Sequence, residues 1–401
     1  MKVAVLFDGL SALGKTPDVL ILDTIEAVEA ALTSAGNQAV RVPVTEDGRW
    51  VERVRRGKFE LVFNLCEGID GVGALEPAVI SALELMGVPY TGATSYTAAI
   101  CLRKHVVNGL LDRAGLPVPR FGVVTPGSQL PSVGFPAICK PAAEDASVGI
   151  EQRSVVRNVR SLAARVEAMH SQWPEILVQR FVDGREVNVG ILGETALPVA
   201  EIDFAGMPKG MWKIVSYQSK WVTGSEEDLG SVPRCPAELS PELTAELKRI
   251  ALTAWRAVGG SGYGRVDFRV DADEKPWLLE VNANPDIAPD AGLARMAGVA
   301  GLDYPALVHA ICEHALARAR RARPGRQLGA GTAIVGRSDA RGPGRPRPLR
   351  NGAALGGPTA AYWCAGSGRS RAHRGDPRRH ACLQRCRGRG RARAVRRGLP
   401  A

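Results

Sequence analysis

The sequence predicts an α/β protein that begins with a parallel α/β domain and continues with an α+β part. Strand-like and helix-like segments alternate over the first 95 residues, and two later segments alternate like a β-hairpin. The chain has 401 residues, 45% of them hydrophobic, which is enough for a large core and for several domains. We predict domains at residues 1–95, 96–185 and 186–320, followed by a tail at 321–401.

The N-terminal segments justify the parallel sheet. Residues 3–7 are an apolar, β-branched run that ends at the turn pair Asp8-Gly9, and residues 18–35 place apolar side chains at helical spacing. Further strands are expected at 39–44 and 61–64, a helix at 74–86 and a strand end at 88–92. Helices that alternate with strands in this way cross over to build a parallel sheet.

The later segments predict the α+β part. A helix over 95–114 should end at the Gly-then-Pro sequence of residues 115–117. Short strands frame one helix, at 161–169, between residues 121 and 182. Residues 186–319 should hold two strands, a helix, the hairpin and a terminal helix. The helix begins with Ser240-Pro241-Glu242, which combines an N-cap, a proline in the first turn and an acid near the positive end of the helix dipole.

The net charge of +11 is concentrated in the tail. Residues 321–401 contain 20 arginines, no lysine and two acids, whereas the first 320 residues carry a net charge of −7. We therefore expect no nucleic-acid partner for the folded body. The tail has few large aliphatic residues, so it should be disordered, and its lysine-free composition suggests GC-rich sequence read out of frame. A protein that binds nucleic acid through this tail is the alternative.

The cysteines and the N-terminus indicate a cytoplasmic protein without a membrane anchor. Five cysteines are scattered singly through apolar segments, which favours reduced thiols. The apolar N-terminal run is too short for a signal sequence or a spanning helix. The cysteines and histidines of the tail fit no common zinc spacing. They are Cys364, His373, His380, Cys382 and Cys386.

The predicted hairpin carries the clearest chemical signal. Period two puts Arg265 and Asp267 on one face of its first strand, and Glu280 and Asn282 on one face of its second. Three oxygen ligands can therefore converge there. Mg²⁺ prefers one or two carboxylates together with phosphate oxygens, which fits this set. A solvated hairpin face is the competing interpretation, but the Leu pair before Glu280 disfavours it.

Two further segments suggest a nucleotide site. Residues 135–141 form a strand that ends in Lys140, and the small-residue loop after it contains Ser147 and Gly149. A lysine beside free backbone N–H groups suits phosphate, although Lys-Pro also ends ordinary edge strands. Residues 176–182 form an extended segment that can present its backbone to adenine, with Glu186 following. By itself this segment is indistinguishable from an ordinary strand and turn.

In this order and spacing, these elements resemble the ATP-grasp superfamily, and residues 1–316 resemble its D-alanine-D-alanine ligase group. The resemblance implies an ATP-grasp fold after a pre-ATP-grasp domain, with Arg265 and Lys220 as catalytic residues. It implies Mg²⁺, or Mn²⁺, on Asp267, Glu280 and Asn282. The implied ATP-binding residues are Lys140, Ser147, Gly149, Gln179, Arg180, Phe181, Val182, Glu186 and Lys220.

The resemblance also implies a reaction. A carboxylate would attack the γ-phosphate of ATP, and an amine would then attack the acyl phosphate to form an amide or peptide bond. The substrates would be small molecules, expected to be amino acids, and the family is commonly dimeric. A nucleotide-binding protein of the same fold with little or no turnover is the alternative. The full set of charged site residues argues against it.

Several positions depart from the family. Its N-terminal substrate motif is absent from residues 10–17, Trp221 replaces a tyrosine, and Ala291 replaces a serine. These changes predict a substrate pair other than two D-alanines. If the helix before residues 114–117 has no insertion, a phosphate-binding lysine of the family aligns with Asn108 rather than with Lys104, and Gln179 replaces an adenine-binding glutamate.

The N-terminal domain offers candidates for substrate binding. Asn64, Glu67 and Glu76 follow the end of a strand, where open α/β sheets bind their ligands. They can bind an amine or another polar substrate. Ordinary polar loop residues are an equally good interpretation.

Overall fold

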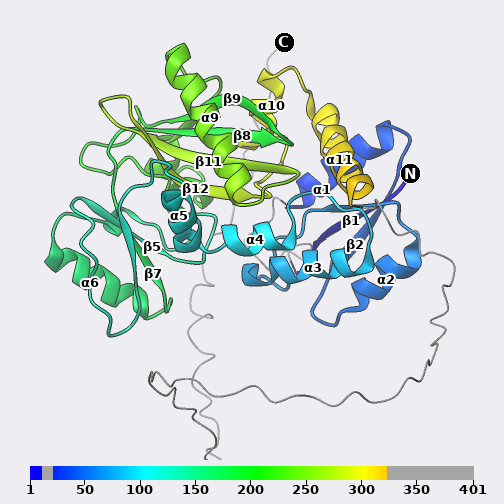
Figure 1. Cartoon of the computed structure of the whole chain (residues 1–401), viewed down its shortest axis with the longest axis horizontal. Coiled ribbons are helices and arrows are strands. Elements are labelled where there is room, and N and C mark those ends of the chain that lie inside the picture. Colours follow the sequence, from blue (N-terminus) through cyan, green and yellow to red (C-terminus); the bar gives the residue numbers. More distant parts are fainter. Residues whose placement is uncertain (11–20, 323–401) are drawn as a thin grey trace, which may run out of the picture. The chain divides into compact units, whose positions relative to one another are not determined.

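The computed structural model describes residues 1–10 and 21–322, whose elements are shown in Figure 1. The described residues group as one compact unit, so the division at residues 95 and 185 stays a prediction. The expectations for residues 11–20, and for the tail from residue 323 on, lie outside the described residues. So do the cysteines and histidines of the tail.

The N-terminal part has the predicted parallel sheet, with strand order β2-β1-β3. Its strands are β1 (Lys2–Asp8), β2 (Gln38–Val44) and β3 (Leu61–Asn64). Both faces of β1 are buried, since Val3 and Val5 pack on the side of α1 and Ala4 and Leu6 on the other side. This explains the continuous apolar run. The expected strand end at 88–92 is reduced to a single parallel bridge between Val62 and Tyr90.

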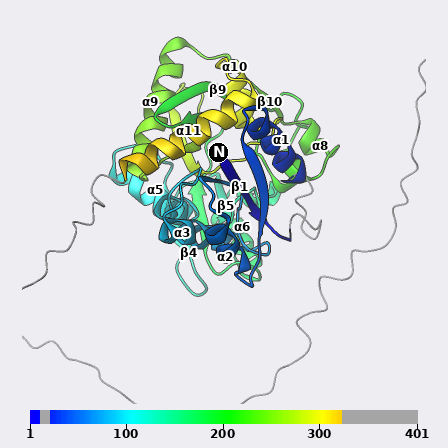
Figure 2. The same ribbon diagram turned by 90° about the vertical axis from the view of Figure 1, so that its right-hand side faces the viewer.

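Helices cover both faces of this sheet. They are α1 (Ile21–Ser34), α2 (Arg49–Gly57) and α3 (Glu76–Met86), the last preceded by a 3₁₀ turn at Gly73–Leu75. Figure 2 shows α11 (Tyr304–Arg321), the terminal helix, beside α1, against which it packs. The sequence pattern does not predict α2. Its nine residues bury only Trp50 and Val54, which is a weak periodic signal.

The single helix predicted over 95–114 is wrong, because the chain forms α4 (Ser95–Cys101) and α5 (Lys104–Arg113). Arg103, between them, has a non-helical backbone with φ −98° and ψ 83°. The Lys104 N–H donates to the Ala142 carbonyl at 3.0 Å instead of continuing the first helix. Tertiary contacts thus override helix propensity at this point.

The second sheet is antiparallel, with strand order β4-β7-β5-β6. Its strands are β4 (Phe121–Val124), β5 (Ala137–Pro141), β6 (Val155–Val156) and β7 (Ile176–Arg180). The helix α6 (Val159–His170) lies against β5 and β7 in Figure 1, and buries Leu162, Val166 and Met169 against them. This agrees with the predicted strands around one helix. A 3₁₀ turn at Gln152–Ser154 precedes β6.

The third sheet is also antiparallel, with strand order β10-β9-β8-β11-β12. Its strands are β8 (Arg185–Leu192), β9 (Thr195–Asp203), β10 (Val232–Arg234), β11 (Tyr263–Val270) and β12 (Pro276–Ala283). The helix α9 (Pro241–Ala257) covers one face, and Ser240 caps it by accepting from the Leu243 N–H. The sequence analysis did not predict β10 or three helices. These are α7 (Tyr217–Trp221), α8 (Glu226–Leu229) and α10 (Gly292–Val299).

The mixed α/β architecture confirms the predicted fold class. The five cysteines of the described residues are free, as predicted for reduced thiols: Cys66, Cys101, Cys139, Cys235 and Cys312. Within residues 1–10 and 21–322, no helix is long and apolar enough to cross a membrane.

Candidate active site

The hairpin of β11 and β12 brings together the side chains that the alternation pattern predicts. Asp267 lies opposite Glu280, and Arg265 lies opposite Asn282. The Asn282 amide donates to the Asp267 carboxylate at 2.8 Å and to Glu280 at 3.4 Å. The extra residue Leu279 forms a β-bulge directly beside Glu280, a type of irregularity that often re-aims a side chain near active sites.

Asp267 is the centre of a polar network. It is only 6% exposed, and Arg265 donates to both of its oxygens, at 2.7 and 2.8 Å. The amide of Asn188 on β8 adds a third donor at 2.6 Å. Burial alone would lower the pKa of Arg265, but the carboxylate of Asp267 raises it above its usual value. Arg265 therefore remains charged.

The donor set fits the predicted magnesium. Asp267 and Glu280 supply two carboxylates and Asn282 an amide oxygen, which leaves further coordination positions for phosphate and water. Among the described residues, no group of three or more Asp, Glu, His or Cys side chains can hold a metal ion. The metal-binding role stays a prediction.

Two buried lysines face this hairpin. Lys140, on β5, is 8% exposed, and Lys104, at the start of α5, is 6% exposed. The Lys104 amine lies 3.6 Å from the Glu280 carboxylate. Burial would raise the pKa of Glu280, but Lys104, Lys140 and Arg265 together hold it well below its usual range. Burial lowers the pKa of Lys140, and nearby Lys104 lowers it further.

The sequence pattern favours Asn108 over Lys104 as the position of the family's phosphate-binding lysine, but Lys104 is the residue whose side chain lies beside the hairpin. Asn108 is fully buried in α5, and its amide has no partner among the described residues. Lys104 instead reaches the hairpin because the helix restarts at this residue. No local pattern marks Lys104 in the sequence; its burial, which a lysine tolerates only when paired, appears only in the structure.

The loop between β5 and the 3₁₀ turn packs tightly against α7. Ala146, Ser147 and Gly149 all have positive φ. The Ser147 hydroxyl donates to the Val215 carbonyl at 3.0 Å, and the Trp221 indole donates to the Ala146 carbonyl at 2.9 Å. Trp221, noted above as a departure from the family, thus holds the predicted phosphate loop.

Only glycine fits at position 149. Its φ is +74°, and an added Cβ would lie 2.7 Å from Pro141 and 2.9 Å from Trp173. The Gly149 carbonyl accepts from the guanidinium of Arg165 at 3.1 Å. The close packing of the loop therefore depends on this residue.

The residues predicted to line an adenine pocket lie at the end of β7. Phe181 is buried and makes an edge contact with Trp212, with ring centroids 5.2 Å apart. Gln179 is fully buried, and neither polar atom of its amide has a partner among the described residues. An unpaired buried amide suits a ligand with both donors and acceptors, such as adenine. Arg180 is exposed and Val182 is partly buried.

Glu186 and Lys220 have different surroundings. Glu186, on β8, pairs with Arg269 at 2.8 Å, and burial raises its pKa although Arg269 opposes the shift. Lys220, on α7, is exposed and lies over the Trp221 ring at 5.2 Å. No contact joins Lys220 to the buried charges of the hairpin within the described residues. Its catalytic role, like the ribose-binding role of Glu186, stays a prediction.

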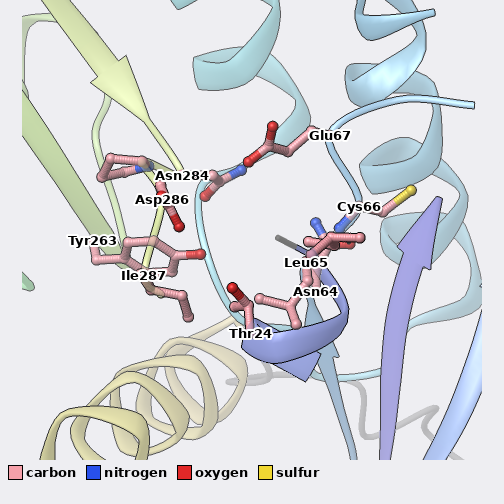
Figure 3. A pocket seen from close by; sticks show the side chains of 11 residues that line it. Thr24, Asn64, Leu65, Cys66, Glu67, Tyr263, Asn284, Asp286 and Ile287 are labelled. Atoms are coloured by element: carbon pink, nitrogen blue, oxygen red, sulfur yellow. The ribbon is translucent and has the colours of Figure 1, made fainter. Parts of the chain in front are cut away.

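A small cavity of about 20 Å³, partly open to solvent, lies between the end of β3 and the loop after β12. Figure 3 shows the Tyr263 hydroxyl directed into it, with Asn64, Glu67 and Asp286 around it. The described residues that line it include no lysine, arginine or histidine. Two of the predicted substrate-binding residues, Asn64 and Glu67, therefore do lie at a pocket.

Glu76, the third of these residues, has a different partner. It accepts from the Asn284 amide at 2.8 Å, while the other end of that amide accepts from the Ala93 N–H at 2.7 Å. Burial raises the pKa of Glu76 to about 7, which the Asn284 bond partly opposes. Glu76 thus connects the N-terminal part to the loop after β12.

Comparison with known proteins identifies the family to which this chain belongs. The sequence profile described as "D-ala D-ala ligase C-terminus" matches residues 110–313. The D-alanine–D-alanine ligase of Citrifermentans bemidjiense is 33% identical over 315 residues, covering 78% of this chain and 96% of that protein. The D-alanine–D-alanine ligase of Dichelobacter nodosus is 31% identical over 320 residues, which cover 79% of this chain and 97% of that protein.

The fold agrees with these sequence matches. The crystal structure of D-alanine–D-alanine ligase from Bacillus anthracis complexed with ATP superposes with a TM-score of 0.64. The superposition covers 80% of this chain and 99% of the Bacillus anthracis chain, and the sequence identity is 20%. Since a profile covers half of the chain and its relatives align over nearly their whole length, the chain belongs to the D-alanine–D-alanine ligase family of the ATP-grasp superfamily.

Proposed function

We propose that this protein is an ATP-dependent ligase that joins a carboxylate to an amine through an acyl phosphate. One observation supports this most directly. Two buried lysines and Arg265 face the paired carboxylates of Asp267 and Glu280. Such a set of opposite charges suits the transfer of a phosphoryl group, where catalysis depends on position and charge neutralisation.

In the first step, a carboxylate oxygen of one substrate attacks the γ-phosphorus of ATP. The bond from that phosphorus to the β,γ-bridging oxygen breaks, and ADP leaves. Lys104 and Lys140 would neutralise the phosphate oxygens. Asp267, Glu280 and Asn282 would hold Mg²⁺, which supplies further charge neutralisation when bound. Gln179, Phe181 and Val182 would hold the adenine.

In the second step, the nitrogen of an uncharged amine attacks the carbonyl carbon of the acyl phosphate. The bond from that carbon to the phosphate oxygen breaks, inorganic phosphate leaves, and the nitrogen loses a proton. Arg265 would stabilise the negative charge that develops on the acyl group. Its bidentate bond to Asp267 fixes the direction of its guanidinium.

The substrates are proposed to be amino acids or related amines other than two D-alanines. Glu67 and Asp286 give the cavity beside β3 acidic character, which suits an ammonium group. Ala291 forms the N-cap of α10 with its backbone only, so it offers no hydroxyl to a substrate carboxylate. A cytoplasmic location and a homodimer remain predictions.

The test is phosphate release from MgATP with a panel of D- and L-amino acids and amines. We expect one pair to stimulate release, and we expect Glu280→Gln to lower the stimulated rate at least about 100-fold. A protein that binds MgATP but releases phosphate with no pair would support the alternative, a nucleotide-binding protein without turnover. If no pair stimulates release and Glu280→Gln also changes nothing, the ligase proposal fails.

A further inference from the structure

A carboxylate of the phosphate loop is paired with a lysine of the proposed ATP site. Asp145 lies five residues after Lys140, and its carboxylate is 2.6 Å from the Lys104 amine. The lysine side chain is 6% exposed, whereas that of Asp145 is 50% exposed. The buried amine of Lys104 is thus paired with a carboxylate, that of Asp145, which is itself half exposed to solvent.

Lys104 is shared between two carboxylates. Its amine is 2.6 Å from Asp145 and 3.6 Å from Glu280. Glu280 lies on β12, the edge strand of the third sheet that pairs with β11, whereas Asp145 lies in the loop after β5. Of the two, Asp145 is the partner that a loop can move away from the lysine.

The loop is also held by hydrogen bonds that do not involve this ion pair. The Ser147 hydroxyl, the Ala146 carbonyl and the Val148 N–H are all bonded elsewhere, to Val215, Trp221 and the Asp145 carbonyl. The neighbouring Glu144 accepts from the Trp173 indole at 3.3 Å. Removing the charge of Asp145 should therefore leave the loop in place.

Electrostatics then determine what Asp145 does to a nucleotide. The phosphates of ATP and ADP are anions that need Lys104 and Lys140, and a carboxylate at the same lysine repels them. It also competes with them for the N–H donors of the amine. Both effects weaken binding, and neither requires contact between Asp145 and the nucleotide.

We propose that Asp145 competes with the phosphates of the nucleotide for Lys104 and so sets the affinity for ATP and ADP. This inference rests on the proposed function, because it assumes that the phosphates bind at Lys104 and Lys140. Asp145 is a positioning residue that acts through Lys104. Its competition limits how tightly the product ADP is held.

The experiment measures the dissociation constants of MgADP and MgATP by calorimetry on the full chain. Asp145→Asn removes the charge and keeps the size of the side chain. We expect it to bind both nucleotides roughly 5- to 50-fold more tightly. Asp145→Glu, which restores a carboxylate, should return the affinity to within about threefold of the wild type.

The matched control is Glu175→Gln. Glu175 pairs with Arg103, the residue next to Lys104, at 2.8 Å, so this change also removes one carboxylate from a neighbouring ion pair. It should leave both dissociation constants unchanged. A melting curve for each variant checks that it is folded, and Asp145→Ser replaces Asp145→Asn if the latter does not fold.

The outcomes separate this inference from the proposed function. If the wild type binds nucleotide and Asp145→Asn binds it equally or more weakly, the competition is absent and this inference is wrong. An equal gain in affinity for Glu175→Gln also overturns it, because general surface charge would then explain the effect. If neither the wild type nor Asp145→Asn binds nucleotide, the proposed function fails as well.

Discussion

At the scale of single residues, the site depends on whether position 104 or position 108 of α5 faces the hairpin. Lys104 and Asn108 lie one helical turn apart on α5, and both are buried. Lys104 has two carboxylates within 4 Å, whereas the amide of Asn108 has no partner among the described residues. An apolar substitution should therefore weaken nucleotide binding at position 104, whereas at position 108 it should stabilise the folded protein.

Lys104→Met should weaken the binding of MgADP by at least about tenfold, because one phosphate-neutralising charge is lost. Asn108→Leu should leave that binding unchanged and raise the free energy of unfolding by about 1 to 2 kcal/mol, since an unpaired buried amide is removed. Calorimetry with MgADP and unfolding in urea measure the two effects. If Asn108→Leu weakens nucleotide binding and Lys104→Met does not, the phosphate-binding position is residue 108, as the family alignment suggests.

At the scale of elements, the loop after β5 is held in a strained backbone. Three of its residues have positive φ, and two of them, Ala146 and Ser147, are not glycine. Such strain persists only where surrounding contacts maintain it. Here the contacts come from α7, through Trp221, and from the segment before α7, through Val215.

Gly149→Ala should destabilise the protein by about 1 to 3 kcal/mol, because alanine is strained at φ +74° and its Cβ would clash with Pro141 and Trp173. It should also raise KM for ATP, since the loop would shift. The matched control is Gly109→Ala, at a helical glycine where an added Cβ meets nothing within 4 Å. Thermal unfolding and the dependence of phosphate release on ATP concentration test both. If Gly149→Ala changes neither the stability nor KM for ATP, the loop does not need this conformation.

At the scale of the whole described part, two side chains connect the N-terminal sheet to the rest. Arg318 on α11 donates to the carbonyls of Tyr90 and Gly92 and to the Ser261 hydroxyl. Asn284 bonds to the Ala93 N–H and to Glu76. This interface contains a carboxyl group whose pKa is raised to about 7 by burial.

The raised pKa of Glu76 makes stability depend on pH. The folded protein holds this proton up to about pH 7, whereas the unfolded chain releases it near pH 4.5, the usual pKa of a glutamate. The folded state therefore binds more protons between these values, so this group makes the free energy of unfolding fall as pH rises from about 5 to 7. We expect a contribution on the order of 1 to 3 kcal/mol.

Glu76→Gln should remove this contribution, because a neutral amide can still accept from Asn284 at every pH. Urea unfolding at pH 5 and pH 7.5 gives the comparison. The loss of stability between the two should be smaller in Glu76→Gln than in the wild type. An identical loss would mean that Glu76 ionises normally in the folded protein.

The sequence by itself determined the features that follow from local periodicity. Alternation along residues 264–270 and 277–282 predicted that Arg265 and Asp267 share one face and that Glu280 and Asn282 share another, because side chains in a strand repeat every two residues. The buried run of β1 and the cap at Ser240 were predicted for similar reasons. Short elements such as α7 and α8 were not, since four or five residues carry little periodic signal.

Only the tertiary structure decided which distant groups meet. The break before α5 directs Lys104 toward Asp145 and Glu280, which lie 41 and 176 residues further along the chain. Asn284 joins Glu76 across 208 residues. Such pairings depend on how sheets and helices pack, and the energy of burying a charge is offset only once its partner is in place. No local pattern contains that information.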